Sequence, residues 1–352
     1  MTLEIGISSV PVDLPAIEEV VEAERLGATS VWVPEFWGYD ALAPLGALAV
    51  ATETIALGTG IVQLGTRTPA MLGMSALSLQ ALSGGRFRLG LGTSGPQVME
   101  GWHGVRFARP IRRTRETIDI VRLVTAGERL EYDGEIYELP LPDGEGRALR
   151  AAAPPARVPI YIASLGPANL ALTGELTDGW IGNSFFPETA DVFFDRIAAG
   201  AESAGRSLDD IDLTVAVACE FTDDVEEAGR RHAEGYAFTF GAMGSAKTNF
   251  YNEAFARQGF GDDVAEVQRL WASGDRDAAR ARVPIEIGLG TNLLGPPEEI
   301  RRRLGLYRDC GVNTLRVGLT GDTPDERLVC LGQLLDLVSE VNAEPTWHPT
   351  RR

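Results

Sequence analysis

Lysine is almost absent from this sequence: Lys247 is the single lysine, and arginine supplies the rest of the 32 basic residues. The segment around it, residues 241–248 (GAMGSAKT), has no glycine directly before the lysine. A Walker A loop needs both residues to hold nucleotide phosphates. This type of nucleotide site is therefore excluded.

Cysteine and histidine are also scarce, with three of each in the chain. Cys219, Cys310 and Cys330 lie far apart and form no CxxC pair. Closely spaced Cys and His pairs are typical of zinc sites, and dense cysteines are typical of disulfide frameworks. We therefore expect neither kind of site. Two of the histidines, His232 and His348, are expected to face solvent.

Long apolar runs and an excess of basic charge are missing too. No apolar run approaches the ~20 residues that span a bilayer, and residues 1–14 show no basic region followed by an apolar stretch. The net charge of −18 disfavours nucleic acid and anionic membranes as partners. We expect a soluble, cytoplasmic protein that acts on a small molecule.

What the sequence does contain is a regular alternation of short apolar runs with segments of helical period. Runs rich in Val, Ile and Leu predict strands at residues 3–9, 30–35, 55–62, 86–93, 159–164, 179–184, 211–220 and 314–320. Apolar residues at helical spacing predict helices at residues 14–26, 44–52, 69–82, 112–125, 167–176, 189–204, 298–310 and 325–341. This alternation predicts an α/β fold, a closed (β/α)8 TIM barrel, with a doubly wound open sheet as the alternative.

Two segments depart from the alternation. Residues 128–157 resemble a small hairpin with an irregular excursion, and residues at about 222–294 form a mostly helical insertion. No segment has the composition of a linker between domains. We therefore expect one barrel domain over residues 1–352.

In such a barrel, the residues that follow the strands form the working face. The candidates are Glu35, Phe36 and Trp37 after the second strand; Gly60, Ile61 and Gln63 at the third; Thr93, Ser94, Gly95, Glu100, Trp102 and His103 after the fourth; Ser164, Leu165, Gly166 and Pro167 after the fifth; and Asn183 after the sixth.

The turn after the fifth strand has the clearest physical meaning. Gly166-Pro167 leads straight into a helix, so we expect free backbone N–H groups at Leu165, Gly166, Ala168 and Asn169 to face the barrel mouth. Unpaired donors and the positive end of a helix dipole bind phosphate well. The alternative is a plain helix start.

Glycines are concentrated at the ends of the third and fourth strands. Residues 90–95 (GLGTSG) match the GxGxxG dinucleotide motif, but they do not belong to the first strand-helix unit and no helix is expected directly after Pro96. We interpret these glycines, and Gly58 and Gly60, as places where a flat ligand approaches the backbone. A simple kink at the barrel rim is the alternative for the third strand.

At these residues the chain resembles the luciferase-like superfamily, above all its coenzyme F420-dependent members. The segments that carry the resemblance are residues 31–38 (VWVPEFWG), 56–105 and 161–182. The most specific feature is the order of three motifs, which are the glycines of the third strand, then TRTPA, then SGGRFRLGLGTSG. The resemblance covers the barrel, and residues 222–294 match least.

The resemblance implies an F420-dependent oxidoreductase and positions for its cofactor. A non-prolyl cis peptide is expected at Gly60–Ile61, against which the ring leans. Glu35 matches an acid near the ring. The other residues implied at the cofactor are Gln63, the ring-contacting loop Thr93, Ser94 and Gly95, and the phosphate turn Ser164, Leu165, Gly166 and Pro167. The resemblance also implies a homodimer.

One departure from the relatives limits what is carried over. Many of them have a histidine directly after the second-strand acid, where this chain has Phe36. Their substrates are therefore not transferred. Candidates for handling a substrate proton are His103 and Glu35, with Glu100 as a weaker one, since imidazole and carboxylate groups act as general acids and bases.

Phe36, Trp37, Trp102 and Asn183 are candidates for substrate contact, although aromatic side chains at a barrel mouth also serve plain packing. Two alternatives stay open beside the F420-dependent oxidoreductase. One is an FMN-dependent monooxygenase, and the other is a non-catalytic protein that binds a flavin or F420, since the superfamily contains both.

Overall fold

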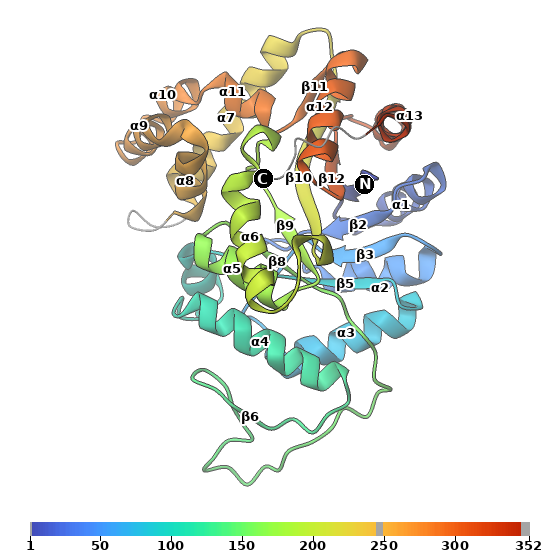
Figure 1. Ribbon diagram of the computed structural model, residues 1–352, viewed down its shortest axis with the longest axis vertical. Coiled ribbons are helices and arrows are strands. Elements are labelled where there is room, and N and C mark those ends of the chain that lie inside the picture. The colour runs from blue at the N-terminus through green and yellow to red at the C-terminus, as the bar shows by residue number, and fades with distance from the viewer. Residues whose placement is uncertain (1, 244–248, 346–352) are drawn as a thin grey trace.

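The computed structural model describes residues 2–243 and 249–345, and in them parallel strands close into a barrel surrounded by helices (Figure 1). The order β12-β1-β2-β3-β5-β8-β9-β10 returns to β12, because β10 pairs with both β9 and β12. The predicted (β/α)8 barrel is confirmed, and the open-sheet alternative is wrong. The barrel strands are β1 (Glu4–Ser8), β2 (Ser30–Val33), β3 (Ala56–Thr59), β5 (Phe87–Gly92), β8 (Ile160–Ala163), β9 (Gly179–Gly182), β10 (Asp212–Phe221) and β12 (Thr314–Leu319).

Two short strands extend this ring. β4 (Val62–Gln63) follows β3 after a break at Gly60–Ile61 and pairs with β5. β11 (Leu293–Gly295) pairs in parallel with β10.

The helices around the barrel begin and end at residues that suit a helix terminus. α1 begins after Asp13, whose carboxylate accepts a hydrogen bond from the Ala16 N–H, and ends at Gly27 with φ of 118°. Left-handed backbone of this kind favours glycine. These helices are α1 (Leu14–Leu26), α2 (Leu42–Ala51), α3 (Pro69–Ser83), α4 (Pro110–Thr125), α5 (Pro167–Leu176), α6 (Asp191–Ser203), α12 (Pro297–Cys310) and α13 (Pro324–Ala343).

Side chains alternate between two packed layers. On β10, Val215, Val217 and Cys219 are buried in the large apolar cluster between the barrel and its helices. A separate small cluster of Trp32, Tyr161 and Ile181 fills part of the barrel interior. The period of two along each strand therefore assigns one set of residues to the outer layer and the other to the interior.

The amino-terminal end of the barrel is filled by a polar group. The Tyr161 hydroxyl donates to Asp212 Oδ2 at 2.7 Å, and Arg88 lies 3.5 Å from the same carboxylate oxygen. Burial raises the pKa of both Tyr161 and Asp212. This group closes the end opposite to the expected site.

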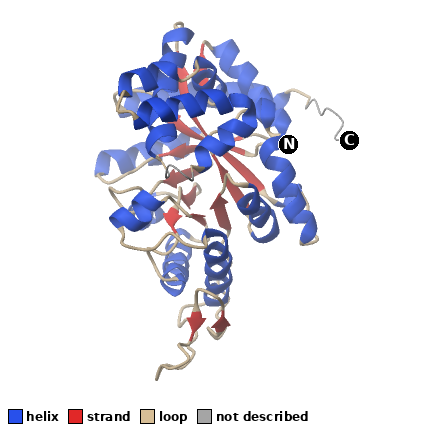
Figure 2. Cartoon of the chain, turned by 90° about the vertical axis from the view of Figure 1, so that its left-hand side faces the viewer, coloured by secondary structure: helices blue, strands red, loops and turns tan. Residues whose placement is uncertain are grey.

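Two segments extend beyond the barrel layers. The hairpin of β6 (Tyr132–Asp133) and β7 (Glu138–Leu139) projects from the body (Figure 2). Residues 222–294 contain α7 (Val225–Ala242), α8 (Phe250–Phe255), α9 (Gly261–Ala272), α10 (Arg276–Arg282) and α11 (Ile285–Gly290).

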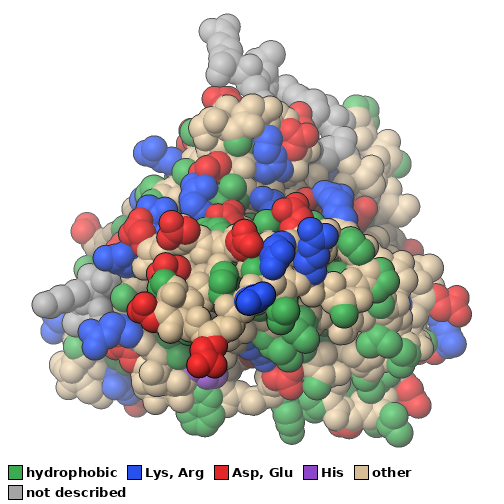
Figure 3. Space-filling model, turned by 90° about the horizontal axis from the view of Figure 1, so that it is seen from below, with side chains coloured by type: hydrophobic (Ala, Val, Ile, Leu, Met, Phe, Trp, Pro, Cys, Tyr) green, Lys and Arg blue, Asp and Glu red, His purple; other side chains and the backbone are tan. Residues whose placement is uncertain are grey.

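Several of these helices share an apolar cluster of their own that includes Phe240, Phe255 and Val267. The face seen from the hairpin end carries acidic, basic and apolar side chains interspersed (Figure 3). Within the described ranges, every helix is too short or too polar to cross a membrane.

Candidate functional site

The strand ends singled out in the sequence lie side by side. In the register of the sheet, Gln63 of β4 is opposite Gly92 of β5, and Gly92 is opposite Ala163 of β8. The tips that carry Gly60, Gly95 and Gly166 therefore belong to consecutive neighbours at the carboxyl edge of the barrel. This is the arrangement that a single ligand needs if it is to contact all three.

The break between β3 and β4 exposes backbone at this edge. Gly60 and Ile61 are half-buried, and the Gly60 N–H donates to the Val33 carbonyl at 2.7 Å. The expected cis peptide at this point is wrong, because Leu139–Pro140 is the only cis bond in the described chain. The strand is interrupted here with a trans peptide.

Packing accounts for most of the strand glycines. A Cβ on Gly58 would lie 2.3 Å from the Trp32 ring, one on Gly90 would lie 2.0 Å from the Thr59 carbonyl, and one on Gly92 would lie 2.7 Å from Ile61. The interpretation that these glycines admit a flat ligand is therefore wrong for these three positions. They make room for protein atoms, whereas Gly60 has only the backbone around Pro34 nearby, at 3.4 Å.

The loop after β5 turns at once into a short π-helix, Gln97–Trp102, in contrast to the expectation of no helix after Pro96. The N–H groups of Val98 and Met99 donate to the Gly95 carbonyl, which ties the loop to the strand end. Ser94 has φ of 54°, a left-handed conformation that non-glycine residues rarely adopt. Strain of this kind is concentrated at ligand sites.

The candidate acids and histidine of this region differ in their environment. His103 ends the π-helix and is exposed. The Glu100 carboxylate accepts a hydrogen bond from the Phe107 N–H at 3.0 Å, so it stabilises its own loop.

Glu35 is buried and fully engaged. Arg67 donates to its two oxygens at 2.8 and 2.7 Å, and the Ala41 N–H donates to Oε2 at 3.1 Å. The Gln63 amide nitrogen donates to the Glu35 carbonyl at 2.8 Å. Hydrogen bonding to Glu35 raises the pKa of Arg67. Arg67 was not singled out in the sequence, although it lies in the TRTPA motif.

The β8–α5 turn has the open helix start that the sequence predicts, with one difference. Gly166 is the N-cap of α5 and offers no side chain to the first N–H groups. The Asn169 N–H is not free, because it donates to the Gly166 carbonyl at 3.0 Å. Ser164 directs its hydroxyl to Thr173 Oγ1 at 2.8 Å, so it fastens the strand to the helix.

Arg257, from the segment after α8, brings a positive charge to this turn. Its Nη2 donates to the Leu165 carbonyl at 2.6 Å. Burial lowers the pKa of Arg257. Nothing in the sequence pattern indicates this residue, because it lies 92 positions away from Leu165.

Buried polar atoms without a partner gather around the same edge. They include Gln63 Oε1, Asn183 Oδ1 and Arg257 Nε. Ser184, directly after Asn183, is left-handed with φ of 55°. Because buried polar groups in proteins are nearly always hydrogen-bonded, these atoms are suited to a ligand.

Aromatic side chains stand at the rim. Phe36, Trp37 and Trp102 are 60%, 50% and 65% exposed, and the rings of Phe36 and Trp37 lie edge to face with centres 6.0 Å apart. Such exposure leaves them available to a flat molecule.

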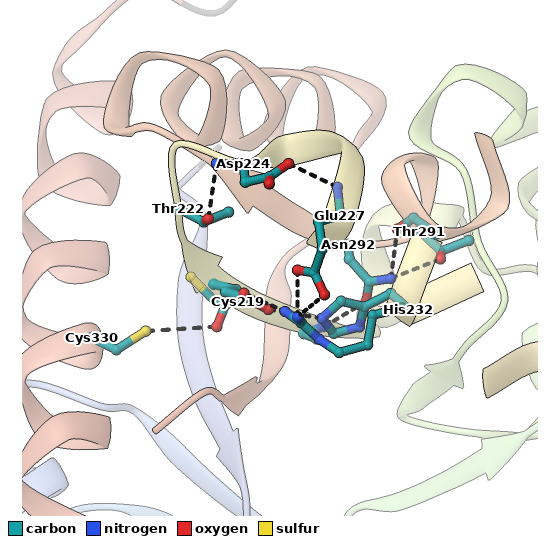
Figure 4. Close-up of polar contacts among 12 residues, drawn as sticks. Cys219, Thr222, Asp224, Glu227, His232, Thr291, Asn292 and Cys330 are labelled. Atoms are coloured by element: carbon teal, nitrogen blue, oxygen red, sulfur yellow. Dashed lines mark hydrogen bonds and ion pairs between the residues drawn. The ribbon is translucent and has the colours of Figure 1, made fainter. Parts of the chain in front are cut away.

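A further polar cluster lies where β10 meets α7 (Figure 4). Glu220 accepts hydrogen bonds from Arg231 at 2.5 Å and contacts the His232 ring at 3.2 Å. The expectation that His232 faces solvent is wrong, since it is half-buried against this carboxylate. His348 lies outside the described residues. No group of three or more His, Cys, Asp or Glu side chains among the described residues could hold a metal ion.

Comparisons with known proteins place this chain in a family. A family model described as luciferase-like monooxygenase matches residues 14–314. A Mycobacterium tuberculosis protein named as a coenzyme F420-dependent oxidoreductase is 38% identical over 85% of this chain and 89% of its own length. Methylenetetrahydromethanopterin reductase of Methanolobus tindarius is 31% identical over 90% of this chain and 94% of its own.

Among solved structures, the F420-dependent tetrahydromethanopterin reductase of Methanopyrus kandleri superposes with a TM-score of 0.78. The match covers 95% of this chain and 98% of that one, at 22% identity. At this identity the likeness shows a common fold.

Proposed function

This chain belongs to the luciferase-like monooxygenase family, and on that premise we propose that it is a coenzyme F420-dependent oxidoreductase acting on a small organic substrate. The observation that carries the proposal is the set of adjacent strand tips at the barrel mouth, β3–β4, β5 and β8, together with a relative of 38% identity that is named for F420. The family resemblance seen in the sequence implies F420 as the cofactor, and the name of this relative agrees with it.

The residues present suit such a cofactor. An F420 molecule has a flat deazaflavin ring and a phosphate. The broken strand at Gly60–Ile61 and the loop Thr93-Ser94-Gly95 offer half-buried backbone to a ring, and Gln63 Oε1 offers an unpartnered acceptor. At the other end, the uncapped start of α5 and the charge of Arg257 offer donors to a phosphate.

When bound, the deazaflavin supplies a carbon that gives or takes a hydride. The protein's residues then bind and orient the reactants, which shortens the approach between the reacting atoms. We assign ring contact to Glu35, Gly60, Ile61, Gln63, Thr93, Ser94 and Gly95, and phosphate binding to Ser164, Leu165, Gly166 and Pro167.

We propose that Glu35 is a positioning residue of the ring site. Its carboxylate is engaged by Arg67, so it fixes the start of the β2–α2 loop and holds Arg67 beside the ring site. We assign transfer of the substrate proton to His103, which is exposed and follows β5 at the carboxyl edge of the barrel. We assign substrate contact to Phe36, Trp37, Trp102 and Asn183.

We propose that residues 1–352 form one barrel domain and that its helical insertion, at about 222–294, belongs to this site. Arg257 reaches the β8 turn, and Gln258 donates to the Ser184 carbonyl at 2.8 Å after β9. The segment therefore contacts two adjacent strand tips.

We also propose that the enzyme is a cytoplasmic homodimer. Cys219, Cys310 and Cys330 are free thiols, as is usual in reducing compartments. Met71, Met74 and Leu82 leave an apolar stripe exposed along α3. Light scattering on the purified protein gives the oligomeric state.

The test of the cofactor is a pair of titrations of the purified protein with F420 and with FMN, followed by fluorescence. We expect tight binding of F420 and weak binding of FMN. The reverse order would favour the monooxygenase alternative. Saturation with reduced F420 that is never consumed with any acceptor would instead favour a non-catalytic binding protein.

A further inference from the structure

Arg316 is a positive charge buried inside the barrel. It lies on β12 and is 5% exposed. Its Nε donates to Thr214 Oγ1 at 3.1 Å and its Nη2 donates to the Gly182 carbonyl at 2.7 Å. The guanidinium carbon lies 5.7 Å from the centre of the Trp32 ring. All three contacts are with neutral groups.

Other buried arginines of this chain have carboxylate partners. Arg303 pairs with Glu188 at 3.1 Å, and Arg308 pairs with Asp309 at 2.7 Å. Arg316 forms no ion pair with any described residue, and its Nη1 has no hydrogen-bond partner among them. Burial lowers the pKa of Arg316 to about 10, so the side chain is charged at neutral pH. An uncompensated buried charge is costly, which suggests that an anion completes this site.

The inward position above Arg316, toward the barrel mouth, carries no side chain. On β12 the next inward position is Gly318, where an added Cβ would meet only the Val217 carbonyl, at 3.9 Å. In the register of the sheet, Gly318 is opposite Ala218 of β10. Ala218 is half-buried, and Ser8, at the end of β1, is exposed. Small inward residues on three neighbouring strands therefore leave a hollow above the guanidinium.

The hollow lies across the barrel from the proposed ring site. Its residues belong to β10, β12 and β1, whereas the ring site belongs to β3, β4, β5 and β8. Arg316 also reaches the carbonyl of Gly182, the last residue of β9, directly before Asn183. A substrate in the hollow thus has Arg316 at one end and the mouth at the other.

We propose that Arg316 binds the carboxylate of an organic-acid substrate that occupies the hollow lined by Ser8, Ala218 and Gly318. A guanidinium binds a planar carboxylate through charge-assisted hydrogen bonds. The inference rests on the proposed function, because it assumes that the cofactor fills the ring site on β3, β4, β5 and β8.

The test uses benzoate and benzamide as probes, which have the same shape and differ in charge. Calorimetric titrations are made on the full chain with and without F420. We expect benzoate to bind at least about tenfold more tightly than benzamide. Arg316→Met removes that preference and leaves benzamide affinity unchanged. Arg303→Met is the control, since this buried arginine has its own carboxylate.

Two further variants locate the anion. Gly318→Leu fills the hollow from above, so it prevents binding of both probes and serves if Arg316→Met does not fold. Gly166→Asp, at the phosphate turn, leaves benzoate binding unchanged in the titrations without F420. Loss of benzoate binding in Gly166→Asp and not in Arg316→Met would overturn the proposal.

Two other results would also overturn it. One is equal affinity of the wild type for the two probes. The other is an Arg316→Met protein that loses F420 while it retains benzoate, which would make Arg316 a cofactor residue. F420 fluorescence in the same samples tests the proposed function separately, because the titrations without F420 report on the hollow alone.

Discussion

Arg67 and Glu35 form a bidentate ion pair at the carboxyl end of β2, with oxygen-to-nitrogen distances of 2.8 and 2.7 Å. The two residues are 32 positions apart. Because Arg67 lies beyond β4 and Glu35 directly follows β2, the pair connects two strand tips of the proposed ring site. It fixes the loop that carries Phe36 and Trp37.

Arg67→Met is expected to destabilise the protein by about 3 kcal/mol, because it leaves the buried Glu35 carboxylate without a cation. Thermal and chemical unfolding measure the loss. Adding Glu35→Gln to Arg67→Met removes the unpaired negative charge, so the double variant is expected to be more stable than Arg67→Met alone. Strictly additive effects of the two substitutions would show that the pair is unimportant.

Gly166→Asp is expected to weaken F420 binding about tenfold, because it places a negative charge at the start of α5. Fluorescence titration measures the affinity. Gly166→Ala is the matched control, since Gly166 has φ of −73° and its added methyl would meet only Phe250, at 3.9 Å. If both variants bind like the wild type, the phosphate lies elsewhere.

His103→Gln is expected to reduce kcat with little change in F420 affinity if His103 handles the substrate proton. The readouts are consumption of reduced F420 with an accepted substrate and a separate F420 titration. His232→Gln is the comparison, because that imidazole is engaged by Glu220. Equal rates in His103→Gln and wild type would remove His103 from the mechanism.

Glu175→Gln is expected to lower stability by about 0.5 kcal/mol at pH 7, because it breaks the ion pair with Arg115 that joins α5 to α4. The hydrogen bond from Arg115 lowers the pKa of Glu175 below its ordinary 4.5. The contribution is therefore present above pH 4.5 and is lost as the pH falls through the lower folded value. Unfolding of both proteins between pH 7 and pH 3 checks this, and a difference that grows on acidification would contradict it.

Gly90→Ala is expected to destabilise the barrel by about 3 kcal/mol, because the added methyl would lie 2.0 Å from the Thr59 carbonyl. Thermal unfolding measures the effect. Gly101→Ala, whose methyl has no neighbour within 4 Å, is the control. A neutral Gly90→Ala would mean that the strand end shifts easily.

The barrel could be predicted because its signals are local. α1 begins after Asp13 and ends at Gly27, and α5 begins at Gly166-Pro167, so both helices match their predicted bounds. Strand tips follow from the alternation, which is why the candidate residues at the mouth are adjacent. The break between β3 and β4 is harder to predict, because a trans peptide joins Gly60 to Ile61 where the resemblance implies a cis one.

The partners of the site residues could not be predicted, since they depend on long-range contacts. The sequence indicates Glu35 as a candidate general acid or base, but it does not show that Arg67 binds both oxygens of the carboxylate. Gly58 looks like a ligand-facing glycine, but the Trp32 ring occupies the space that its side chain would need. Arg316 has no pattern around it that distinguishes it from the other arginines of a lysine-poor chain.

The polar group of Tyr161 and Asp212 has a consequence for how reactants exchange. With that end of the barrel filled, molecules reach the interior from the opposite end. Cofactor and substrate then enter and leave through the same end of the barrel. Each therefore passes beside the site of the other, so a high concentration of either one slows the exchange of the other.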